Sequence, residues 1–181
     1  ANAAFAFGTG DFTVESWVYT PATQTQFAAI ACNINNPDGW FLSFSTSNLI
    51  TFSNWNTTAL TSSVAVTIGA WAHVAVSRSG TSIRMFINGQ QVASATNSTT
   101  YGVAGSATYV GYNSQTHYFS GYMSNLRILK GTALYTTPFV PPVLPPTNIS
   151  NTSLLLNATN AGIYDATGIN NIETVGNAQV S

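Results

Sequence analysis

Hydrophobic and polar residues alternate with a period of two through most of the chain. The alternation runs through residues 12–19, 40–45, 49–55, 71–78, 83–88 and 90–95. Residues 109–112 and 118–129 supply further strands, and residues 153–156 form a short apolar run typical of a buried strand. A period of two is typical of β-strands, since successive side chains point to opposite faces of a sheet. A last possible strand covers residues 172–180, and no segment shows the period of an amphipathic helix.

Turn-forming residues separate these segments at short intervals, at 8–11, 36–39, 79–80 and 102–105. Asn88-Gly89 stands between two alternating segments and predicts a type I′ hairpin, because both central residues of that turn need positive φ. Many short strands joined by tight turns are typical of an antiparallel sandwich or barrel. We therefore expect an all-β fold.

Five prolines interrupt the pattern between residues 138 and 146. Proline lacks the N–H that a central strand donates, so residues 138–150 are predicted to form an extended linker or an edge segment. The predicted sandwich core therefore comprises residues 1–137, which precede this segment. Residues 151–181 leave two alternatives open: their strands complete this sandwich, or they pair with a neighbouring module.

Charge is scarce, which narrows the possible partners. Of the 181 residues, four are basic and five acidic, and the formal net charge is −1. Four cations cannot form the positive surface that nucleic acid requires, so we expect no nucleic-acid partner. No apolar run approaches ~20 residues, so we expect neither a membrane span nor a signal peptide. Cys32 is the single cysteine and is expected to be a small buried apolar residue.

Several segments resemble laminin G-like jelly rolls of the concanavalin A-like lectin and glucanase superfamily. They are GTGDFTVESWVY (8–19), WAHVAVSR (71–78), RMFING (84–89) and GYMSNLRI (121–128), in that order. The segment KGTALYTTPF (130–139) resembles the version found in virion and tail-fibre proteins of tailed phages, including marine ones. The resemblance covers roughly residues 5–146 and implies an antiparallel jelly-roll β-sandwich of two curved sheets. Within it, Trp17 and Trp71 are core candidates.

The order of the segments departs from the phage-type pattern. In those modules a stretch like residues 152–180 usually precedes the motif at residue 8, whereas here it follows. We therefore expect a chain cut from a longer polypeptide, or a permuted one, located in a virion or outside the cell. Those modules also carry a further strand, which here would belong before Ala1, and a sheet edge left open without it would invite pairing with a partner.

Catalytic chemistry is not apparent in the sequence. Glucanases of the superfamily place two glutamates close together on one strand, but this chain has only Glu15 and Glu173. On a strand, Asp11 and Glu15 would lie about 13 Å apart, whereas glycosidase carboxyl pairs lie roughly 5 to 9.5 Å apart. His73 is expected to be a hydrogen-bonded structural residue, and no clustered Cys or His predicts zinc. We expect no enzyme, and a glycoside hydrolase is the least favoured alternative.

Loop residues offer the chemistry of a carbohydrate site, which needs an aromatic face and amide or carboxylate groups for hydroxyls. Trp55, between Asn54 and Asn56, is the best candidate for an exposed aromatic platform. The competing interpretation is that such aromatics close the ends of the sandwich. The full candidate set is Asn33, Asp38, Trp40, Trp55, Asn56, Tyr112, Asn113, His117 and Tyr118.

Calcium is a further possibility that the resemblance implies, because many laminin G-like domains hold one ion near the sandwich rim. Candidate ligands are Asp11, Asp38 and Asp165, each of which could instead be a turn or capping residue. Related modules often carry an acidic residue in the return strand, where this sequence has Ser124 and Asn125.

Two functions follow from the resemblance and the loop chemistry. One is a non-enzymatic structural or adhesive module of a virion or extracellular assembly, such as a tail fibre or capsid decoration, with carbohydrate-binding capacity. Its partners would be other subunits, as a homo-oligomer or tandem modules, and cell-surface glycans. The alternative is a dedicated lectin module of a bacterial surface or secreted protein.

Overall fold

The computed structural model describes residues 3–115, 117–157 and 162–180, which form a short 3₁₀ helix and eleven strands. The helix η1 is Ala3–Phe5, and the strands are β1 (Phe12–Tyr19), β2 (Ala28–Asn33), β3 (Trp40–Phe44), β4 (Leu49–Ser53), β5 (Thr58–Ala65), β6 (Trp71–Ser79), β7 (Ser82–Ile87), β8 (Gln90–Thr96), β9 (Thr108–Val110), β10 (Tyr122–Lys130) and β11 (Thr152–Leu156). None of the described residues belongs to a helix long and apolar enough to cross a membrane.

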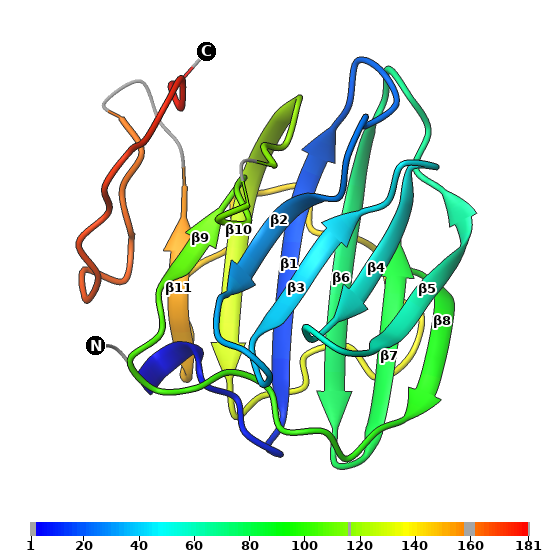
Figure 1. Ribbon diagram of the computed structural model, residues 1–181, viewed down its shortest axis with the longest axis vertical. Helices are drawn as coiled ribbons and strands as arrows, with labels where there is room; N and C mark the ends of the chain where they lie inside the picture. Colours follow the sequence, from blue (N-terminus) through cyan, green and yellow to red (C-terminus); the bar gives the residue numbers. More distant parts are fainter. Residues whose placement is uncertain (1–2, 116, 158–161, 181) are drawn as a thin grey trace.

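The strands form two antiparallel sheets that lie face to face (Figure 1). One sheet has the order β11-β10-β1-β6-β7-β8, and the other has the order β5-β4-β3-β2-β9. The predicted all-β sandwich is therefore confirmed. The hairpin at Asn88-Gly89 joins β7 to β8, with both residues at positive φ (50° and 75°) as a type I′ turn requires.

The core lies between the two sheets and is rich in aromatic rings. Phe12 of β1 stacks on Phe52 of β4 with ring centroids 5.4 Å apart, and Phe7 stacks on Trp40 at 5.0 Å. Trp17 and Trp71 are not part of this core, contrary to the sequence-based expectation. They alternate with the inward residues Val18 and Ala72, so they lie on the outer face of the six-stranded sheet, and Trp71 is 46% exposed.

The proline-rich segment crosses the outer face of the six-stranded sheet. We call residues 132–147 the strap. The indole of Trp17 donates a hydrogen bond to the Pro142 carbonyl (3.0 Å), and the Phe139 N–H donates to the Gly89 carbonyl (3.0 Å). Gly89 is required here, because a Cβ at this position would lie 1.8 Å from the Phe139 carbonyl oxygen.

Strand β11 follows the strap and pairs antiparallel with β10, with Leu154 opposite Ile128. The chain then returns along the edge of the sandwich (Figure 1), where the Asp165 carboxylate accepts the N–H groups of Leu155 (3.1 Å) and Thr167 (3.0 Å). Residues 172–180 contain no strand, so that expectation is wrong: their apolar side chains, such as Val175 at 61% exposure, find no sheet to pack against.

Candidate functional site

A cleft of about 340 Å³ opens on the outer face of the five-stranded sheet. Its floor is formed by side chains of β3 and β4 that alternate with the core residues of those strands. The floor residues are Phe41, Ser43, Thr51 and Ser53. The two walls are the β4–β5 loop and a segment between β9 and β10, and Phe27 lies at the rim.

The β4–β5 loop is fixed by its own asparagine. The Asn54 side-chain oxygen accepts the N–H groups of Asn56 (3.0 Å) and Thr57 (2.7 Å), which is the local bonding that makes asparagine a turn former. This turn presents Trp55 to the cleft, where its ring stands edge-on to Phe41 with centroids 5.0 Å apart. The cleft thus has an aromatic wall.

The opposite wall is formed by residues 111–115 and 117–119, which we call the arm. Its ends pair through the Phe119 N–H and the Gly111 carbonyl (2.9 Å) and through a bridge between Tyr112 and Tyr118. The Cys32 thiol donates to the Tyr112 carbonyl (3.3 Å), which holds the arm over β2. Burial raises the pKa of that thiol to about 12, so Cys32 is an inert packing residue as expected.

Asn113 orders the polar groups of the arm. Its Oδ1 accepts the Gln115 N–H (3.0 Å), while its Nδ2 donates to the Phe27 carbonyl (3.2 Å) and to His117 Nδ1 (3.1 Å). Because an amide nitrogen can only donate, His117 Nδ1 is the acceptor in this hydrogen bond. His117 and Gln115 therefore offer polar groups to the cleft that Trp55 faces from the other side.

The structure brings four predicted carbohydrate-binding residues to this cleft: Trp55, Asn56, Asn113 and His117. Tyr112 and Tyr118 stack on each other (4.9 Å) at the base of the arm but do not line the cleft. Asp38 lies in the β2–β3 loop, where its backbone carbonyl accepts the Gly102 N–H.

Two of the predicted residues lie in the interior and are removed from the candidate site. Trp40 has no exposed surface, and its indole donates to the Phe5 carbonyl (2.9 Å). Asn33 is equally buried and donates to the Ser106 carbonyl (3.3 Å) and the Thr108 hydroxyl (3.1 Å). Sequence reasoning missed the floor residues Phe41, Ser43, Thr51 and Ser53, although their alternation with core residues was a usable signal.

A buried cluster of titratable groups lies under the strap, on the other sheet. Glu15 accepts hydrogen bonds from Arg127 Nε (2.7 Å), the Tyr135 hydroxyl (2.7 Å) and His73 Nε2 (3.0 Å), and Glu15 and His73 are each 1% exposed. Burial by itself would raise the pKa of Glu15, but these partners outweigh it and hold the pKa below its usual value. A carboxylate sealed in this way ties the strap to the sheet and is closed to a glycan.

The three candidate calcium ligands lie at separate turns. Asp11 accepts the Gly80 N–H (2.7 Å), and both oxygens of Asp165 accept hydrogen bonds. Over the described ranges, no three acidic, histidine or cysteine side chains gather as a metal site would require. The three predicted ligands therefore do not come together at one site, and calcium binding stays a prediction.

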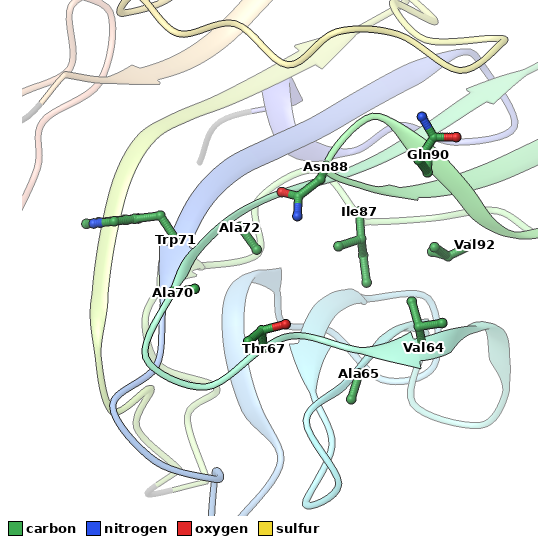
Figure 2. Close-up of a pocket in the computed structure, with 10 residues that line it drawn as sticks. All are labelled: Val64, Ala65, Thr67, Ala70, Trp71, Ala72, Ile87, Asn88, Gln90 and Val92. Atoms are coloured by element: carbon green, nitrogen blue, oxygen red, sulfur yellow. The ribbon is translucent and has the colours of Figure 1, made fainter.

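A second hollow, of about 390 Å³, lies between β5 and the β7–β8 turn. Figure 2 shows Val64 and Ile87 on opposite sides of it, while the Trp71 ring points away from it. Its walls are mainly aliphatic, and it lies on the side of the sandwich where the edge strands β5 and β8 of the two sheets are neighbours. It has two amide side chains, Asn88 and Gln90, whereas the first cleft has Asn54, Asn56, Asn113 and Gln115. The first cleft is therefore the candidate binding site.

The fold and this cleft define a lectin-type β-sandwich, and sequence comparison gives the family. Residues 1–134 match the model of the Concanavalin A-like lectin/glucanases superfamily, and the chain belongs to this laminin G-like family. No curated protein is detectably similar to the chain.

Solved structures share the fold at low sequence identity. A Bacteroides ovatus protein thought to bind carbohydrate has a TM-score of 0.64 and 16% identity; the match covers 96% of this chain but only 56% of that one. Domain 4 of the extracellular arabinanase AbnA from Geobacillus stearothermophilus, solved with arabinotriose, has a TM-score of 0.58 and 19% identity. The match covers 72% of this chain and 65% of that one. The carbohydrate-binding module CBM40 of a Ruminococcus gnavus sialidase, bound to α2,3-sialyllactose, has a TM-score of 0.56 and 12% identity. The match covers 71% of this chain and 80% of that one.

Proposed function

We propose that the protein is a non-catalytic glycan-binding module and that its ligand occupies the cleft on the five-stranded sheet. The observation that carries this proposal is the placement of Trp55 on one wall opposite Gln115 and His117 on the other. A sugar ring has an apolar face that packs on aromatic rings and a rim of hydroxyls that both donate and accept hydrogen bonds.

The remaining lining supports the same function. Asn56 is exposed, and hydroxyl groups of Ser43, Thr51 and Ser53 form the floor. Amides and hydroxyls match both hydrogen-bonding roles of a sugar hydroxyl. Two of the similar structures were solved with an oligosaccharide, one neutral (arabinotriose) and one acidic (sialyllactose), which supports a saccharide ligand without choosing between these classes.

A glycan array probed with the wild type, Trp55→Ala and Trp71→Ala tests the proposal. Trp71 is a matched control because it is a half-exposed tryptophan on the other sheet. We expect Trp55→Ala to weaken glycan binding by up to about tenfold, since packing on an aromatic ring contributes roughly 0.5–1.5 kcal/mol. Trp71→Ala should bind like the wild type. Binding that Trp55→Ala leaves intact would remove the cleft as the site.

The strap supports a second role, as a structural or adhesive subunit of a virion or other extracellular assembly. Val140, Val143 and Leu144 are 89%, 86% and 74% exposed within this short segment. Exposed apolar clusters of this kind favour contacts with other subunits, in a homo-oligomer or between tandem modules. Light scattering of the purified chain tests this role: a stable oligomer supports it, and a strict monomer favours a free-standing lectin module.

A further inference from the structure

The charges of the chain are divided unequally between the two sheets. All four basic residues of the sequence belong to strands of the six-stranded sheet: Arg78 on β6, Arg84 on β7, and Arg127 and Lys130 on β10. The five-stranded sheet that carries the cleft therefore has no cation on any strand or connecting loop.

Three of these cations are also engaged within the protein. Arg78 has no exposed surface and donates to the carbonyls of Gly8 (2.7 Å) and Thr99 (2.7 Å). Arg127 binds Glu15, and Lys130 Nζ donates to the Ala3 carbonyl (2.8 Å). Arg84 alternates with Ile83 and Met85 of the core, so it lies on the outer face of the six-stranded sheet, on the side of the molecule away from the cleft.

The lining of the cleft holds no lysine or arginine either. Its polar members are hydroxyls and amides together with His117, whose Nδ1 accepts a hydrogen bond from Asn113. Neither aspartate nor glutamate occurs among its described residues. A sugar carboxylate entering this cleft would lose hydration without gaining an ion pair, whereas a neutral sugar exchanges hydroxyl–water for hydroxyl–amide hydrogen bonds.

We infer that the ligand is an uncharged saccharide, built from neutral pentoses or hexoses, and that the cleft discriminates against sialic and uronic acids. This inference rests on the proposed glycan-binding function and specifies its ligand class. The discrimination arises from the missing charge partner, because no attraction to a cation offsets the desolvation cost of the bound carboxylate.

The experiment uses an array of matched glycan pairs. The pairs are lactose and sialyllactose, xylan fragments without and with glucuronic acid, and galacturonate oligomers with methyl-esterified and free carboxyls. We expect every bound glycan to be neutral, and its acidic counterpart to bind at least about tenfold more weakly. Affinity for the neutral member should be nearly constant up to about 0.5 M NaCl, since no ion pair is screened.

A gain-of-charge variant probes the cause. Gln115→Arg places a cation at the rim of the cleft, and Gln91→Arg places one on β8 of the other sheet, where Gln91 is exposed. Gln115→Arg should raise the ratio of acidic to neutral affinity by about tenfold, and Gln91→Arg should leave it unchanged.

The outcomes separate the inference from the function on which it rests. A tightest ligand that is acidic, with affinity that falls as salt is added, overturns the inference alone. A ratio that Gln115→Arg fails to raise overturns it as well. Binding of no glycan of either kind overturns the proposed function itself.

Discussion

Glu15 of β1 and Arg127 of β10 face each other across neighbouring antiparallel strands, and Arg127 Nε lies 2.7 Å from Glu15 Oε1. The pair is covered by the strap, whose Tyr135 hydroxyl donates to the other carboxylate oxygen. A buried ion pair does not by itself add much stability, but removing one partner leaves the other charge uncompensated. In this protein the pair fixes where the strap lies.

We expect Glu15→Gln to lower the free energy of unfolding by about 3–5 kcal/mol near neutral pH, because Arg127 keeps its buried charge. The pKa of Glu15 in the folded protein lies below the 4.5 of the free side chain. Its ionisation therefore stabilises the fold above that value, and this contribution is lost as pH falls through the lowered pKa. Urea unfolding at several pH values should show that the free energy of unfolding falls less on acidification in Glu15→Gln than in the wild type.

Some acid sensitivity should persist in that variant, because the pKa of Asp165 is also lowered. Burial would raise it, but the hydrogen bonds from Thr167, Leu155 and Asn170 outweigh this effect. If the free energy of unfolding fell equally on acidification in Glu15→Gln and in the wild type, Glu15 would not contribute to the pH dependence of stability.

Tyr135→Phe should loosen the strap while the sandwich stays folded. The variant removes one hydrogen bond to a charged acceptor, which is worth about 1.5–3 kcal/mol, but keeps the ring that stacks on Phe139 at 3.6 Å. Hydrogen exchange should accelerate at the amides of Leu134 and Phe139, which bond to Thr13 and Gly89. Tyr118→Phe, at an exposed tyrosine of the arm, is the control. Equal exchange at those two amides in both variants would argue against the role of Tyr135.

The strand pattern predicted most of the fold because a period of two survives wherever one face is buried. Two strands, β2 and β5, were not predicted. β2 is buried along its whole length, so it reads as a continuous apolar run without alternation. β5 lies at a sheet edge and is built largely from Thr, Ser and Ala, with Leu60 and Ser62 as its buried residues. In both cases tertiary position, which the local sequence does not encode, decided the structure.

The site was predicted less completely, for a related reason. Trp55 and Asn56 were found because turn chemistry is local, but Trp40 was wrongly included because it also follows a turn. Whether an aromatic residue beside a turn points inward depends on strand register: Trp40 shares the inward face with Leu42 and Phe44. The strap likewise covers Glu15 and His73 through Tyr135, which is more than fifty residues away from either of them in sequence.

Leu154→Ala tests whether the residues after the strap complete this sandwich. Leu154 is 3% exposed and belongs to the core cluster, so its truncation should cost about 2–4 kcal/mol in urea unfolding. Val175→Ala is the control in the same part of the chain, since Val175 is 61% exposed and should change stability by less than about 0.5 kcal/mol. Equal stabilities of the two variants would mean that β11 belongs to another module.

Asn113→Ala tests whether the arm must be ordered for glycan binding. The substitution leaves the Phe27 carbonyl and His117 Nδ1 without their donor and the Gln115 N–H without its acceptor, so the cleft loses its fixed polar wall. We expect affinity for the best array ligand to fall by more than about tenfold, and stability to fall by about 1–3 kcal/mol.

Asn97→Ala is a matched control for this change, because the Asn97 side chain accepts the Thr99 N–H (2.9 Å) in a turn that follows β8, on the other sheet. It should cost comparable stability and leave calorimetric affinity unchanged. If both variants bind the glycan as the wild type does, the arm is dispensable, and recognition must then rest on Trp55 and the floor of the cleft alone.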